Sequence, residues 1–157
     1  MTPAPSFAGS LVLDANVSIA ICSKEAGRDA LATAEITRYL RTGYHLFAPG
    51  VIVAETLYVL CGKRTSGSLS PADYATSVAA FERLMLSVSP PPGGDARLIR
   101  RAEQILAGYG CSRSADGIYI ALAESLALTQ PATLLTFDKE LPKQVAKNAP
   151  TVRVHLL

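Results

Sequence analysis

Short apolar runs alternate with helix-like segments along nearly the whole chain. The runs LVLD (11–14), HLFAP (45–49) and ATLLTFD (132–138) predict short buried strands, and LSVS (86–89) and TVRVHLL (151–157) predict two more. Strands that alternate with helices are typical of a parallel sheet with helices on both faces. The pattern therefore predicts an α/β fold, a three-layer α/β/α sandwich with a central, mainly parallel sheet.

Helical signals occupy the segments between these strands. Gly43 and Gly110 act as helix stops, Pro49 suits the first turn of a helix, and the stretch from Ser70 to Asp73 resembles a capping box. The helices are expected at about residues 16–22, 28–42, 50–63, 71–86, 95–109, 114–128 and 139–147.

Length and composition favour one globular domain. The chain has 157 residues, of which 49% are hydrophobic and 18% charged, and this composition can build a core. The Pro-rich start, residues 1–9, is expected to be a flexible tail, and residues 10–157 a single domain. The formal net charge of +2 is too small to indicate nucleic-acid binding by itself.

Several sequence features bear on the compartment. The N-terminus lacks the basic and long apolar regions of a signal peptide, and no apolar stretch reaches the ~20 residues of a membrane span. The 3 cysteines are an odd number without C-x-x-C spacing, and they are expected as reduced, buried or half-buried thiols. These features predict a cytoplasmic protein that does not enter a membrane.

Two aspartates close predicted strands and precede predicted helices. Asp14 ends LVLD, and Asp138 ends ATLLTFD. Because sites in parallel sheets form where loops leave the carboxyl ends of the strands, these aspartates are candidates for one site. Aspartate is also a favoured helix N-cap, and that role alone could explain Asp14. Thr136, two residues before Asp138, could direct its hydroxyl to the same side of the strand.

Two further acids interrupt apolar helical stripes. Glu55 lies one turn from Val51 and Val59, so its carboxylate needs a basic partner, a proton or a cation if it is buried. A glutamate at the rim of the core that reaches solvent is the alternative. Asp116 precedes Ile120 by one turn, at the start of a helix, where a favourable interaction with the helix dipole also explains an acid.

Considered together, the four acids indicate a metal site more strongly than any one of them does alone. Carboxylates that converge at one end of a sheet repel one another, and divalent cations would keep them ionised. The two histidines, His45 and His155, are isolated, so oxygen ligands dominate and favour Mg²⁺ or Mn²⁺ over zinc. Such a site can activate water and stabilise the oxygens of a phosphoryl displacement.

The ordered motifs resemble those of PIN-domain proteins, the fold of the VapC toxins of toxin–antitoxin pairs. LVLDANV, the glutamate in FAPGVIVAETLYVL, SADGIYIALAE and LLTFDKEL follow the family's order from about residue 10 to 155. The resemblance implies a metal-dependent endoribonuclease. It implies catalytic, metal-ligating roles for Asp14, Glu55, Asp116 and Asp138.

The resemblance also implies supporting residues and partners. Asn16 and Thr136 match polar positions that would orient the carboxylates or water. The third motif departs from the family pattern in two ways. No second acid follows Asp116 within a turn, although some relatives carry one, and Gly117 lowers the helix propensity beside Asp116. Many family members form homodimers, and the toxins are held inactive by a small antitoxin protein.

An RNA substrate needs cations near the carboxylates. Lys24 follows the first motif, Arg113 precedes the third and Lys139 follows Asp138, so these three are candidate phosphate contacts. Each is also explained as an ordinary solvated charge. Tryptophan is absent and no RRM-like aromatic pattern is present, so base stacking is not a visible theme.

Two other functions remain open. LVLDANVS loosely resembles the D-x-D-x-T/S strand end of haloacid-dehalogenase-like phosphatases, but Asn16 stands where those enzymes need a second aspartate. The other is a PIN-like module that binds RNA or protein with little or no catalysis. Four clustered acids argue against it, because a binding module need not bear their repulsion.

Overall fold

The fold is built on a five-stranded parallel sheet. The computed structural model describes residues 7–111 and 116–157. Within them the strand order is β3-β2-β1-β4-β5, and every neighbouring pair is parallel. The strands are β1 (Gly9–Leu13), β2 (Tyr44–Phe47), β3 (Val88–Ser89), β4 (Ala132–Thr136) and β5 (Arg153–Leu156).

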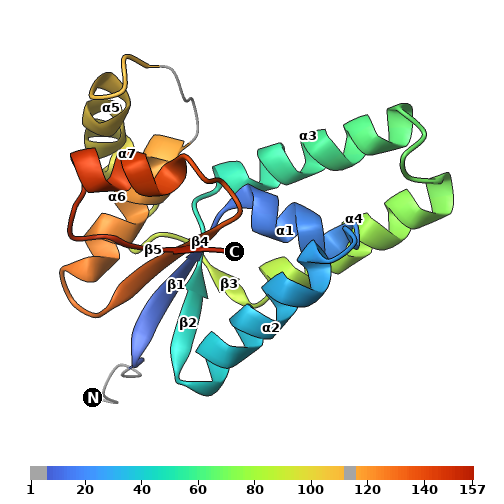
Figure 1. The fold of residues 1–157 in the computed structure, drawn as a ribbon, viewed down its shortest axis with the longest axis horizontal. Coiled ribbons are helices and arrows are strands. Elements are labelled where there is room, and N and C mark those ends of the chain that lie inside the picture. The colour runs from blue at the N-terminus through green and yellow to red at the C-terminus, as the bar shows by residue number, and fades with distance from the viewer. Residues whose placement is uncertain (1–6, 112–115) are drawn as a thin grey trace.

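Helices cover the sheet from both sides, so the predicted three-layer α/β/α fold is confirmed. Figure 1 shows α1 to α4 on one side of the sheet and α5 to α7 on the other. The helices are α1 (Ala15–Cys22), α2 (Arg28–Arg41), α3 (Val51–Thr65), α4 (Pro71–Met85), α5 (Ile99–Ala107), α6 (Asp116–Ala127) and α7 (Leu141–Asn148), with a short 3₁₀ helix, η1 (Asp95–Leu98), before α5.

The start of the domain differs from the expectation. Residues 1–6 of the expected tail lie outside the described residues, whereas Phe7 stacks on His45 and the Ala8 amide donates to the Gly43 carbonyl. β1 begins at Gly9, two residues before the predicted strand. The two additional residues are Gly9 and Ser10, which do not belong to the apolar run from which the strand was predicted.

Other element boundaries move by one or two residues. β1 ends at Leu13 and β4 ends at Thr136, so Asp14 and Asp138 follow their strands and do not close them. The helix predicted over 95–109 is divided into η1 and α5. The first two residues of the helix predicted over 114–128 lie outside the described residues, and α6 begins at Asp116.

The core forms where the central strands meet the helices. Leu11, Val12 and Leu13 on β1 are fully buried, as are Leu134 and Leu135 on β4. Such continuous apolar strands are typical of parallel sheets that are covered on both faces. The site at the carboxyl ends of β1 and β4 therefore rests on the most buried part of the fold.

All three cysteines are unpaired, but only Cys22 is buried; Cys61 and Cys111 are exposed, which corrects the expectation of buried or half-buried thiols. Cys61 lies on the outward side of α3, where the apolar composition of the segment was misleading. Among the described residues, none of the helices combines the length and apolarity that a membrane span requires.

Gly117 allows α6 to pack closely against α5. A Cβ at this position would lie 2.7 Å from Leu106 Cγ and 2.9 Å from the Ala102 carbonyl oxygen. The glycine therefore reflects helix packing, which outweighs its weak helix propensity. Because Asp116 is the neighbouring residue, this contact also sets the position of that carboxylate.

We predict that Gly117→Ala destabilises the fold by about 1–3 kcal/mol, because the added methyl group overpacks the α5–α6 contact. The matched control is Gly62→Ala in α3, where a Cβ would meet nothing within 4 Å. That change should stabilise by about 0.5–1 kcal/mol, since alanine favours helix. Urea denaturation measures both, and equal free energies of unfolding for the two variants would contradict the packing role.

Candidate metal centre

Asp14 occupies the N-cap position of α1, but its side chain does not cap the helix. No capping hydrogen bond reaches the carboxylate. Instead, Oδ2 accepts from Thr136 Oγ1 at 2.6 Å and from Asn16 Nδ2 at 2.8 Å. Asp14 is only 8% exposed. The carboxylate is therefore turned toward β4. The backbone of Asp14 occupies the N-cap position, as one alternative from the sequence expected, while its side chain belongs to the candidate site, as the other expected.

Thr136 joins the ends of β1 and β4. Its hydroxyl donates its only proton to Asp14 and accepts from Asn16 Nδ2 at 3.1 Å and from the Asp138 amide at 2.9 Å. Asn16 Oδ1 in turn accepts from the Phe137 amide at 3.1 Å. These bonds tie the segment that carries Asp138 to the start of α1. They bring four of the predicted site residues, Asp14, Asn16, Thr136 and Asp138, into one network.

Glu55 reaches the site from α3. It is half-buried, and its Oε2 accepts from the Tyr119 hydroxyl of α6 at 2.6 Å. The next residue, Thr56, forms a buried 2.7 Å hydrogen bond with Ser18 of α1. Since Ser18 lies one turn after Asp14, this hydroxyl pair fixes α3 against the helix that begins at the first carboxylate.

Asp116 begins α6 and contacts α7. Its Oδ2 accepts from Gln144 Nε2 at 3.0 Å, and the Gln144 side chain is buried. A favourable interaction with the helix dipole is available at this position, as the sequence suggests. The buried amide adds a specific orientation, because Gln144 holds the carboxylate from the neighbouring helix.

The acids influence one another electrostatically. Burial, together with the nearby carboxylates of Asp116 and Glu55, raises the pKa of Asp14 to about 6, and the Thr136 hydrogen bond opposes this shift. Burial and Asp116 also raise the pKa of Glu55, although the Tyr119 hydroxyl opposes this shift. Asp14, Glu55 and Asp116 thus belong to one field of negative charge.

The three candidate RNA contacts have different positions. Lys139 is exposed and adjoins Asp138. Lys24 is exposed and follows the C-terminal end of α1, whereas Asp14 precedes its N-terminal end. The 8 residues of α1 span roughly 12 Å, so the helix separates the two side chains. It lines a cavity with Leu69 and Asp73 instead. Arg113 lies outside the described residues.

Sequence reasoning missed Tyr119 and Gln144. Both donate to predicted site acids, yet Tyr119 is hidden within an apolar helical pattern and Gln144 within a short, polar helix. Only the packing of α6 against α3 and α7 reveals their targets. Polar groups buried in apolar surroundings need partners, so the hydroxyl of Tyr119 was the one available signal.

The fold and the site together define a class: an α/β/α domain with an acidic, hydrogen-bonded site at the carboxyl edge of a parallel sheet. Within that class, the chain matches the PIN domain model over residues 11–148. It belongs to the PIN domain family. This membership confirms the resemblance drawn from the four ordered motifs.

A solved structure shares the fold. The chain resembles one from the crystal structure of VapBC2 from Rickettsia felis bound to a DNA fragment from their promoter, with a TM-score of 0.63 and 11% identity over 94% of this chain and 98% of that one. At this identity the likeness concerns the fold. Comparison with curated proteins gives no significant match.

We predict that Asp14→Asn stabilises the metal-free protein at pH 8. The pKa of Asp14 is raised in the folded state, so folding retains its proton and wild-type stability falls as the pH rises from about 4 to about 6. A shift to about 6 corresponds to a gain of up to about 3 kcal/mol for the neutral amide.

Urea denaturation in EDTA at pH 4 and pH 8 measures this difference. The gain of Asp14→Asn over wild type should be large at pH 8 and should shrink toward pH 4, where Asp14 is protonated in the folded protein. Glu103→Gln, an exposed acid on α5, is the matched control. The same gain at both pH values would contradict the raised pKa.

Proposed function

We propose that this chain is a divalent-metal-dependent endoribonuclease that hydrolyses phosphodiester bonds in RNA. Its membership of the PIN domain family supports a nuclease in general. The observation that carries the proposal is the buried Asp14 carboxylate, which Asn16 and Thr136 orient beside other acids. A binding module gains nothing from this arrangement, whereas a nuclease can use it to hold cations.

The donor set suits Mg²⁺ or Mn²⁺. Asp14, Glu55, Asp116 and Asp138 offer only hard oxygen ligands. Burial and, to a lesser extent, repulsion from Asp116 and Glu55 raise the pKa of Asp14, and a bound cation would offset both effects. Within the described residues, no three acidic, histidine or cysteine side chains already form a metal-ligating cluster, so water or side-chain rotation would complete the coordination. The bound ion would activate water and stabilise charge on the phosphate.

The chain's own hydrogen bonds would prepare the ligands. Thr136 and Asn16 bond Oδ2 of Asp14, Tyr119 restrains Glu55 and Gln144 restrains Asp116. Ligands that are held by outer partners keep their orientation when the ion arrives. Lys139, exposed beside Asp138, is our candidate for a contact with the RNA phosphate.

We further propose that the chain is the toxin of a toxin–antitoxin pair. The resemblance of its motifs to VapC toxins and the fold shared with the Rickettsia felis VapBC2 structure support this role. A small antitoxin protein would then be its partner, a homodimer its assembly and the cytoplasm its location. The phosphatase alternative loses support, because Asn16 is a neutral hydrogen-bond donor to Asp14 and the chain belongs to the PIN domain family.

Cleavage of a small-RNA pool tests the nuclease directly. With Mg²⁺ or Mn²⁺ the wild-type protein should cut RNA, EDTA should abolish cutting, and Asp14→Asn should lower the rate at least about 100-fold, since it removes a charged ligand. Glu103→Gln should cut like wild type, because that acid is exposed on α5.

Equal cutting by wild type and Asp14→Asn would identify the activity as a contaminant and contradict the proposal. Binding of Mn²⁺ without cleavage of any RNA in the pool would favour the PIN-like binding module. Hydrolysis of a generic phosphomonoester, lost in Asp14→Asn, would instead restore the phosphatase reading.

A further inference from the structure

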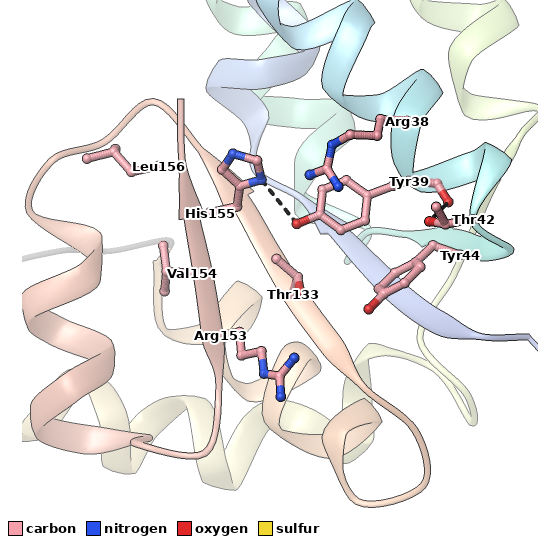
Figure 2. Close-up of a pocket in the computed structure, with 9 residues that line it drawn as sticks. All are labelled: Arg38, Tyr39, Thr42, Tyr44, Thr133, Arg153, Val154, His155 and Leu156. Carbon is pink, nitrogen blue, oxygen red and sulfur yellow. Dashed lines mark hydrogen bonds between the residues drawn. The ribbon is translucent and has the colours of Figure 1, made fainter.

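A polar cavity away from the four acids lies on the sheet, on the side covered by α2. Its volume is about 430 Å³, within the usual range of ligand pockets, ~300–1,000 Å³. Figure 2 shows its wall of side chains from α2, β2, β4 and β5. The lining residues are Arg38, Tyr39, Thr42, Tyr44, Thr133, Arg153, Val154, His155 and Leu156.

The strand register explains why these residues face one space. Tyr44 pairs with Gly9 across β2 and β1, and Thr133 pairs with Arg153 across β4 and β5. His155 is two residues after Arg153, so it lies on the same face. A Cβ at Gly9 would lie 2.5 Å from Tyr44 Cε1, so the tyrosine ring occupies the surface of β1 that a side chain would fill. Because Gly9 has no side chain, the Tyr44 ring can lie over β1 and line the cavity.

The cavity is rich in hydrogen-bond donors. Arg153 is exposed, and its guanidinium has no ion pair or side-chain hydrogen bond among the described residues. Figure 2 shows Arg153 and the hydroxyl end of Tyr44 directed toward the same space. Of the described residues that line the cavity, none is acidic. An unneutralised guanidinium is suited to a phosphate, which it can bind through two parallel hydrogen bonds.

The rest of the wall is already organised. The Tyr39 hydroxyl bonds His155 Nδ1 at 3.0 Å, and the Tyr39 and Tyr44 rings pack edge to face with centroids 4.9 Å apart. Arg38 pairs with Glu35 at 2.7 Å and stacks over Tyr39. The contacts hold the aromatic wall in place before any ligand arrives, which lowers the entropic cost of binding.

We propose that this cavity binds a nucleotide, with the phosphate on Arg153 and the base against Tyr44. Aromatic rings stack on every base, and a guanidinium recognises phosphate, so the pair selects a nucleotide over either fragment. The nucleotide is free in solution or part of an RNA strand; the second source rests on the function proposed above. In either case the site is separate from the four acids.

Nuclear magnetic resonance of the wild-type chain provides the first test. The chain has 2 histidines, of which His155 lines the cavity and His45 bonds Ser89 and stacks on Phe7 elsewhere. Titration with adenosine 5′-monophosphate in EDTA should shift the ring signals of His155 and leave those of His45 unchanged. No shift of His155 at saturating millimolar nucleotide would overturn the proposal.

Substitutions on the same assay locate the phosphate contact. Arg153→Ala should weaken binding at least about tenfold, and Arg153→Lys should weaken it less, because a point charge remains. Arg100→Ala, an exposed arginine on α5, controls for net charge. Asp14→Asn should bind like wild type, so a failed nuclease assay does not affect this result. Equal binding by Arg153→Ala and Arg100→Ala would overturn the site.

The affinities of four ligands show whether the cavity recognises the base, the phosphate or both, and whether it prefers a free nucleotide or an RNA strand. Adenosine and inorganic phosphate should each bind more weakly than the monophosphate, since each lacks half of the contacts. A trinucleotide that binds more tightly than the monophosphate assigns the site to an RNA strand, and the reverse order assigns it to a free nucleotide. Inorganic phosphate that binds as tightly as the nucleotide would overturn the role of Tyr44 and with it the proposal.

Discussion

The hydrogen bond from Thr136 to the buried Asp14 carboxylate is the interaction on which the site depends. A buried carboxylate without partners is costly, and here one hydroxyl offsets part of that cost while it also accepts from the Asp138 amide. The same contact joins the ends of β1 and β4. The two central strands, the first helix and the loop that carries Asp138 are therefore fixed by one threonine side chain.

The surrounding helices deliver the remaining acids to this point. α3 brings Glu55, and the Ser18–Thr56 pair sets its distance from α1. α6 brings Asp116, and the bare surface of Gly117 sets its approach to α5. The fold thus concentrates negative charge at one edge of a sheet and restrains the carboxylates of Asp14, Glu55 and Asp116 with neutral donors. In the metal-free protein these carboxylates repel one another, and a bound cation would relieve this repulsion.

The fold and six of the eight residues of the candidate site could be predicted from the sequence, because their signals are local patterns and short motifs. Apolar runs mark the strands, and Asp14 and Asp138 lie one and two residues after the ends of β1 and β4. Tyr119 and Gln144 escaped prediction because their roles depend on which helices pack together. The start of β1 at Gly9 and the cavity beside it escaped prediction for a related reason. A glycine weakens the strand signal in the sequence, and only the structure shows that the Tyr44 ring occupies the space left by the missing side chain.

Binding of Mn²⁺ to the RNA-free protein, followed by electron paramagnetic resonance of the free ion, tests the metal site apart from any choice of substrate. Wild type should bind Mn²⁺, and Asp14→Asn should bind at least about tenfold more weakly, since loss of a ligand exceeds the usual effect of losing its supporting hydrogen bond. Glu103→Gln should bind like wild type. Equal affinity of wild type and Asp14→Asn for Mn²⁺ would show that the four carboxylates do not form a metal centre.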